Sequence, residues 1–81
     1  MDRLFQKIEV GFHKEINRPW QPDRFIWQDR TYTVLEVGRR WQDEDGEHIL
    51  VMASGEQVFE LILATNQINW YLKPPAAARM A

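Results

Sequence analysis

The sequence predicts an all-β fold: a single small domain of about five or six antiparallel strands in a meander, curled into a barrel or roll. Three observations lead to this prediction. Apolar and polar residues alternate with the period of two that half-buried strands show. Turn-forming residues interrupt the alternation about every ten positions. Large side chains also gather on common faces when the interruptions are closed as tight hairpins.

Length and composition limit the chain to one domain, expected over residues 1–73, with a frayed tail over 74–81. The 81 residues are 44% hydrophobic and 27% charged, an ordinary globular balance rather than that of a disordered chain. The chain has no cysteine. A disulfide framework and a thiolate zinc site are therefore excluded.

Neither a membrane span nor a targeting segment is expected. No run approaches the roughly 20 apolar residues of a membrane helix, and the stretch 1–4 contains Asp2 and no apolar core of a signal peptide. We therefore expect a cytoplasmic protein without a membrane partner. The net charge of -2 gives no global attraction to nucleic acid or to an anionic membrane.

A first strand is expected over residues 6–16, followed by an ordered loop over 17–23. The strand's apolar residues alternate with polar or small neighbours: Ile8, Val10, Phe12 and Ile16. Pro19 and Pro22 indicate the loop, because proline removes a backbone donor and disfavours helix in the residue before it.

Four two-residue turns are expected after this loop, at Asp29-Arg30, Asp45-Gly46, Ser54-Gly55 and Asn66-Gln67. Directly opposed residues share a face. The last three turns then agree on one buried set: Trp41, Leu50, Met52, Phe59, Leu61, Leu63, Trp70 and Leu72. The first turn aligns a second set on one face: Phe25, Trp27, Tyr32 and Val34. In the long strand 31–42, this face is the opposite one from the face of Trp41.

Gly38 is the only glycine in that long strand, and a bulge there would bring both sets onto one core. Residues 54–62 also fit a capped helix, since Ser54 and Gln57 have capping-box spacing. We favour a strand, because its register agrees with both neighbouring strands.

The opposite face is too apolar for a solvated sheet and is a candidate protein interface. Its members are Ile49, Val51, Val58, Ile62 and Tyr71. We expect the stretch 1–16 to cover part of this face. The alternative is that a partner protein or a second copy of the chain covers it.

Catalytic equipment is scarce. Ser54, His48 and Asp43 could meet within one hairpin, but the sharp Gly-x-Ser-x-Gly turn of a serine nucleophile is absent. No two glycines have the spacing of a phosphate-binding loop. We therefore predict a protein that is not an enzyme, with no cofactor and no small-molecule substrate.

The acidic stretch 43–46 resembles part of a calcium loop, but Trp41 and Met52 stand where that loop needs oxygen ligands. A solvated hairpin tip is the simpler interpretation. His48 could hold a divalent ion weakly together with the neighbouring carboxylates of Asp43, Glu44 and Glu47. We predict no dedicated metal site.

Charge is distributed unevenly along the chain. Residues 42–60 contain six acidic residues and neither lysine nor arginine, whereas 18–41 is rich in arginine. Arginines beside aromatic rings are typical of surfaces that bind single-stranded nucleic acid. The candidate residues for such a surface are Arg18, Trp20, Arg24, Arg30, Arg39 and Arg40. The hairpin register assigns the other nearby aromatic residues to the core.

Several aromatic motifs occur in a fixed order along the chain. They are Pro22, Phe25-x-Trp27-x-x-x-x-Tyr32-x-Val34-x-x-Val37, Arg40-Trp41, Gly55-x-x-x-Phe59-x-Leu61 and Trp70-Tyr71-Leu72. With them the chain resembles a small bacterial β-domain family of unknown function, over about residues 8–73. It is also similar to the C-terminal domain of some Y-family DNA-polymerase-like repair proteins. The resemblance implies a non-catalytic accessory module near DNA repair, with Trp41 and Trp70 as packing residues.

Two functions are compatible with these observations. The first is a protein-interaction or self-association module that uses the second apolar face. The alternative is a single-stranded nucleic-acid-binding accessory module linked to DNA repair, which uses the arginines.

Overall fold

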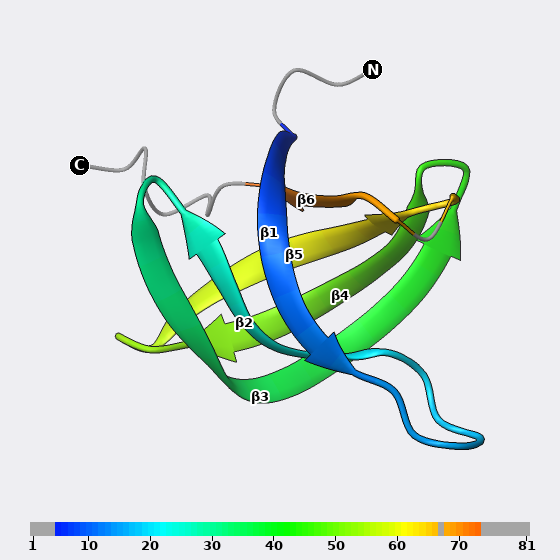
Figure 1. Ribbon diagram of the computed structural model, residues 1–81, viewed down its shortest axis with the longest axis horizontal. Helices are drawn as coiled ribbons and strands as arrows, with labels where there is room; N and C mark the ends of the chain where they lie inside the picture. Colours follow the sequence, from blue (N-terminus) through cyan, green and yellow to red (C-terminus); the bar gives the residue numbers. More distant parts are fainter. Residues whose placement is uncertain (1–4, 67, 74–81) are drawn as a thin grey trace.

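The computed structural model describes residues 5–66 and 68–73, and it consists of six antiparallel strands in one closed barrel (Figure 1). The strands are β1 (Gln6–His13), β2 (Gln21–Trp27), β3 (Arg30–Asp43), β4 (Gly46–Ala53), β5 (Gln57–Ala64) and β6 (Trp70–Lys73). The predicted all-β fold is confirmed. Within the described part of the chain, no helix has the length and apolarity needed to cross a membrane.

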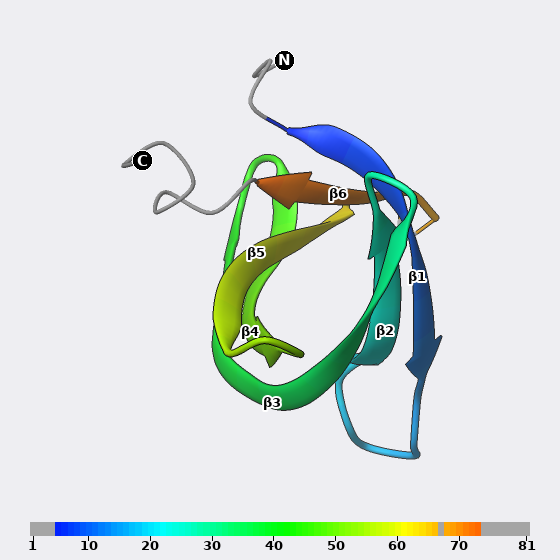
Figure 2. The same cartoon turned by 90° about the vertical axis from the view of Figure 1, so that its left-hand side faces the viewer.

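Each strand pairs with the next, and β1 pairs with β6 to close the barrel. The closing ladder joins Gln6 to Leu72 and Ile8 to Trp70. Figure 2 shows the resulting ring of strands, with β1 between β2 and β6. The expectation that residues 1–16 cover a second face is therefore wrong for β1, which forms part of the wall.

β3 is the longest strand and belongs to two ladders. Its first residues pair with β2, and its residues from Val34 onward pair with β4. The register shifts between Val34 and Glu36 and again between Val37 and Arg40. The second shift contains Gly38, so the predicted bulge is confirmed. Bulges increase local bending and twist, which accounts for the pronounced curve of β3 in Figure 1.

The barrel interior is filled by residues from all six strands. An aromatic cluster occupies one part of it, where Phe25 stacks on Tyr32 at a centroid distance of 5.2 Å and Phe59 lies edge-on to Phe25 at 5.0 Å. Trp27 packs on Phe59, and its indole N–H donates to the side-chain oxygen of Gln6 at 2.9 Å. The predicted first core set is confirmed, with Trp27 and Val34 partly buried against the cluster.

The β2–β3 turn consists of Gln28 and Asp29, one residue earlier than predicted. Both have positive φ, at 53° and 63°, as the primed turns of two-residue hairpins require. Phe25 therefore opposes Tyr32. The face is unchanged, because the pairing moves by an even number of residues.

The β3–β4 turn is likewise earlier than predicted, at Glu44 and Asp45, with Asp43 paired to Gly46. Gly46 has a φ of 140°, and a Cβ there would clash with the carbonyl oxygen of Leu63. The position therefore requires glycine. The strand pairing demands a close approach of β5, which a side chain would block.

The β4–β5 connection has three residues, 54–56, rather than the predicted two. Gly55 and Glu56 both have positive φ, and Ala53 pairs with Gln57. A third turn residue shifts the register by one, so Val51 rather than Leu50 opposes Phe59.

This one-residue shift exchanges the two faces of β4. Ile49, Val51 and Ala53 are buried in the interior, so the prediction that Ile49 and Val51 lie on an outer face is wrong. Leu50 and Met52 are on the outer face instead, and so is Trp41. The remaining members of the predicted core are confirmed: Phe59, Leu61, Leu63, Trp70 and Leu72.

Other boundaries also differ from expectation. β1 ends at His13, and Ile16 lies in the β1–β2 loop with 89% of its surface exposed. Pro22 belongs to β2, where it sits opposite the register shift at Phe12. Residues 57–64 are a strand, as favoured over the helix. The predicted tail 74–81 and the turn residue Gln67 lie outside the described residues.

Candidate functional site

The outer face of β3 to β6 carries a buried polar centre built on His48. Only 4% of His48 is exposed. Its Nδ1 lies 2.6 Å from Oε2 of Glu60, and its Nε2 lies 2.9 Å from Oδ1 of Asp43. The indole of Trp41, directly across the ladder, stacks on the imidazole at 5.1 Å and 10°. We call these four residues the His48 centre.

Sheet geometry explains why these residues meet. His48 opposes Trp41 on β3 and Ile62 on β5, so these three side chains share the outer face. Glu60 precedes Ile62 by two residues on the same face and reaches back to the imidazole. Asp43 is the last residue of β3, from which its carboxylate turns over the end of the hairpin.

Carboxylates only accept hydrogen bonds, so both ring nitrogens of His48 must carry hydrogen to satisfy Glu60 and Asp43 together. Burial by itself would lower the pKa of His48. The hydrogen bonds to Glu60 and Asp43, together with their negative charges, outweigh burial and raise the pKa of His48 above its ordinary value. The His48 hydrogen bond, helped by the backbone N–H of Asp45, in turn lowers the pKa of Asp43.

The suggested serine triad does not form. Ser54 follows the far end of β4, where its Oγ accepts a hydrogen bond from the backbone N–H of Thr33. His48 instead bonds to two carboxylates. The charged partner that the sequence interpretation missed is Glu60. Its signal was its position as the only charged residue in the apolar stretch 58–63.

Metal-ligating atoms do converge near the tip of the β3–β4 hairpin. One nitrogen of His48 and one carboxylate oxygen from each of Asp43 and Asp45 lie within 4.8 Å of one another. The sequence interpretation proposed Glu44 and Glu47 as neighbours of His48. Neither belongs to this group, and Glu47 instead pairs with Arg40.

An apolar patch lies beside the His48 centre on the same outer face. Leu35 is 58% exposed at the first bulge of β3, and Val58 is 50% exposed on β5. Met52 lies between the two strands, paired to Glu36 and Val58. We define the outer patch as Leu35, Leu50, Met52, Val58 and Tyr71, which are exposed or half-buried. Of the predicted interface residues, Val58 and Tyr71 belong to it, and Ile62 lies beside it but is buried.

The candidate arginines do not form one surface. Arg18 lies in the β1–β2 loop, 3.6 Å from Glu15. Arg30 begins β3 next to the β2–β3 turn, which Figure 1 shows on the other side of the barrel from that loop. Arg39 lies over the ring of Trp41 at 5.7 Å. The positive charges are therefore spread around the wall.

Arg40 and Trp20 have structural contacts. Arg40 pairs with Glu47 at 3.0 Å and donates to the backbone oxygen of Trp20. Trp20 packs edge-on against Phe12 at 4.7 Å. Neither side chain is the free platform or free cation that the sequence interpretation assumed.

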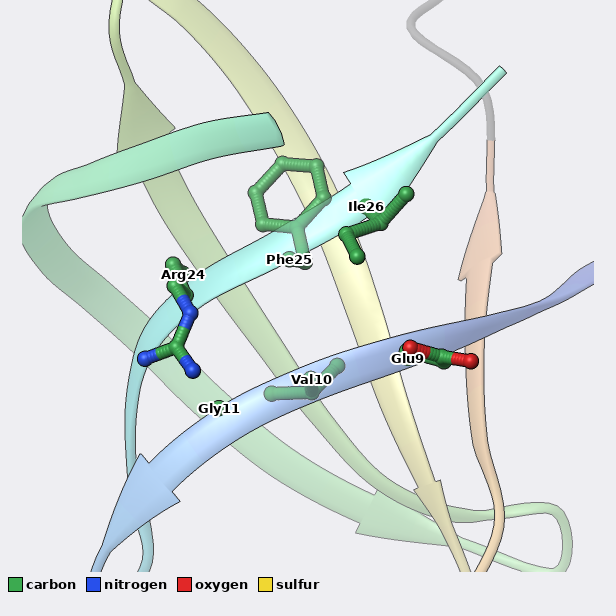
Figure 3. Close-up of a pocket in the computed structure, with 6 residues that line it drawn as sticks. All are labelled: Glu9, Val10, Gly11, Arg24, Phe25 and Ile26. Atoms are coloured by element: carbon green, nitrogen blue, oxygen red, sulfur yellow. The ribbon is translucent and has the colours of Figure 1, made fainter. Parts of the chain in front are cut away.

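Arg24 borders a shallow hollow of about 120 Å³ on the outside of β1 and β2 (Figure 3). Its guanidinium lies so close to Gly11 that a Cβ there would come within 2.7 Å of it. A second hollow of about 130 Å³ lies near the β3–β4 tip. Small-molecule sites usually measure about 300–1,000 Å³, so neither hollow has the volume of such a site.

The chain has no match among protein-family models, curated proteins or solved structures. The resemblance to the bacterial β-domain family therefore stays a prediction.

Proposed function

We propose that this domain is a non-enzymatic protein-binding module, which docks a partner with a basic surface on its outer patch. The exposure of Leu35 and Val58 carries the proposal. Single exposed apolar residues are common, but Val58 pairs with Met52, and Leu35 directly precedes Glu36, which pairs with Met52 from the other side. An apolar group of this kind on a small soluble domain is typical of an interaction site.

Charge supports a basic partner. Glu36 belongs to the same outer face as the patch, and Glu44 and Asp45 are exposed at the hairpin tip, whereas Glu60 and Asp43 are already paired with His48 and Glu60 also lies opposite Lys73. Residues 42–60 contain no lysine or arginine. Basic residues on the partner would complement this rim, speed association and set orientation.

The same rim disfavours self-association. A symmetric dimer places identical patches against each other. The carboxylates around the patch would then oppose carboxylates, which costs free energy unless they are protonated. We therefore expect the domain to be a monomer near neutral pH.

A protein partner also fits better than a single-stranded nucleic acid. Nucleic-acid surfaces combine a continuous positive groove with free aromatic rings. Here Arg40 is neutralised by Glu47, and Trp20 packs on Phe12. Trp41 is stacked on His48, and the Arg39 guanidinium already lies over its ring.

Photo-crosslinking in cells that naturally produce the protein tests the proposal. A photoreactive amino acid replaces Val58 in one variant and Ile26 in another, because Ile26 is similarly exposed, at 40%, on a different strand. We expect adducts with one basic protein at position 58 only, and fewer adducts as salt is raised.

Three outcomes would contradict it. Equal labelling at positions 26 and 58 would show that the patch is not special. A crosslinked dimer of the chain itself would show that the partner is a second copy. Adducts to nucleic acid at position 58 would replace the protein partner with a nucleic acid.

A further inference from the structure

We propose that His48, Asp43 and Asp45 form a Zn²⁺ site at the tip of the β3–β4 hairpin. The three side chains offer one imidazole nitrogen and two carboxylate oxygens, all within 4.8 Å of one another. Zinc accepts nitrogen and oxygen ligands in tetrahedral sites, with three protein ligands and one water as a common arrangement. Ligand atoms around a tetrahedral zinc lie about 3.3 Å apart, which small rotations of the two exposed aspartates can reach.

The buried imidazole distinguishes this group from an ordinary acidic turn. His48 is held on β4 by the stacked Trp41 ring and by Glu60, so its Nε2 points towards the hairpin tip. Glu60 accepts hydrogen from the opposite nitrogen, Nδ1, at 2.6 Å. A carboxylate on the non-ligating nitrogen is the usual outer partner of zinc-bound histidine, because it fixes the tautomer and raises ligand basicity.

Zinc binding replaces a proton on His48 with a metal ion. His48 Nε2 gives its proton to solvent, and the freed lone pair binds Zn²⁺. Nδ1 keeps its hydrogen bonded to Glu60. His48 Nε2 and the Asp43 carboxylate would then both bind the metal in place of their hydrogen bond. Ca²⁺ and Mg²⁺ prefer sites made of oxygen ligands alone, so the imidazole favours zinc over both.

The other histidine provides an internal comparison. His13 also contacts carboxylates, with Nδ1 2.9 Å from Asp23 and Nε2 4.0 Å from Glu15. Its side chain is half exposed, however, and it has no ring stacked on it like that of Trp41 on His48 among the described contacts. We expect this second group to bind zinc much more weakly.

Calorimetric titration of the chelator-treated full chain with ZnCl₂ tests the site. We expect one equivalent to bind with micromolar affinity. Asp45→Asn should abolish this binding, and Glu60→Gln should weaken it by about tenfold or more. Glu44→Gln and His13→Gln are matched controls that should leave it unchanged. Asp45 is exposed, so its variant keeps the fold, which thermal melting verifies.

Nitrogen NMR of the imidazoles supplies an independent measurement. Zinc should shift the Nε2 resonance of His48 and leave its Nδ1 hydrogen in place, with no comparable change at His13. Equal loss of affinity in Asp45→Asn and Glu44→Gln would mean an adventitious ion only. Absence of binding, or a signal from His13 alone, would overturn the proposal.

Discussion

The guanidinium of Arg40 lies 3.0 Å from the carboxylate of Glu47, and both side chains are about four-fifths buried. Arg40 pairs with Ile49 and Glu47 pairs with Leu63, so both charged residues face the barrel interior. Arg40 also donates to the backbone of Trp20 and thereby ties the β1–β2 loop to β3. This arginine is an internal tie rather than a surface cation.

We expect Arg40→Ala to lower the free energy of unfolding by about 1–3 kcal/mol, because it leaves Glu47 and the Trp20 carbonyl without their charged donor. Urea unfolding measures the change. Arg30→Ala is the control, since Arg30 is exposed at the start of β3 and should change stability by less than about 0.5 kcal/mol. Equal effects would argue against the internal role of Arg40.

The exchanged faces of β4 lead to a second prediction. Ile49→Ala removes a fully buried interior side chain and should cost about 2–5 kcal/mol. Leu50→Ala removes a half-buried outer side chain and should cost clearly less. Thermal or urea unfolding of the two variants checks the order. The reverse order would restore the two-residue turn at Ser54-Gly55.

Gly46→Ala should destabilise the barrel by more than the roughly 1–3 kcal/mol that backbone strain alone costs. The reason is that the substitution combines a φ of 140° with a clash against the Leu63 carbonyl. Gly55 has a φ of 85° but open space around it. Gly55→Ala should therefore cost only about 1–2 kcal/mol of backbone strain. Similar losses in the two variants would mean that β5 does not approach Gly46 closely.

The His48 centre should make the stability of the metal-free protein depend on pH from both sides. The pKa of His48 is raised by folding, so its contribution is complete below the ordinary histidine pKa and is lost as pH rises through the folded value. The pKa of Asp43 is lowered, so its contribution is present above 3.8 and is lost as pH falls through the folded value. Stability from this centre is therefore greatest between those limits.

Urea unfolding at a series of pH values, with a chelator present, measures this dependence. His48→Gln should remove the loss on the alkaline side, because the titrating imidazole is gone. His13→Gln should keep it, since His13 lies outside the His48 centre. An alkaline limb that survives in His48→Gln would assign the pH dependence to another group.

Period-two patterning was sufficient to predict the fold class, the residues of β5 and β6 that face inward, and the bulge near Gly38. It was insufficient for β4, because the face of a strand depends on whether its turn has two residues or three. Ser54-Gly55-Glu56 allows both lengths, and only Glu56 at a φ of 58° decides between them. One residue thus reassigned Ile49, Val51, Leu50 and Met52.

The His48 centre was harder to predict, because its members come from three strands. Asp43 and His48 are close in sequence, but Glu60 reaches them only through the β4–β5 register. Arg40 shows the same limit. Its contact with Glu47 follows from the β3–β4 register, in which Arg40 opposes the buried Ile49 and therefore faces inward. Residue type alone suggested a solvent-facing cation.

The ladder between β1 and β6 joins only the stretches 6–8 and 70–72. Because those stretches lie at opposite ends of the folded sequence, the cylinder is sealed only after the last strand has left the ribosome. Until then, the apolar inner face of β4 and β5 is exposed to solvent. The short ladder between β1 and β6 thus makes synthesis of β6 a condition for a protected core, and loss of either stretch would leave a sheet with two unpaired edges.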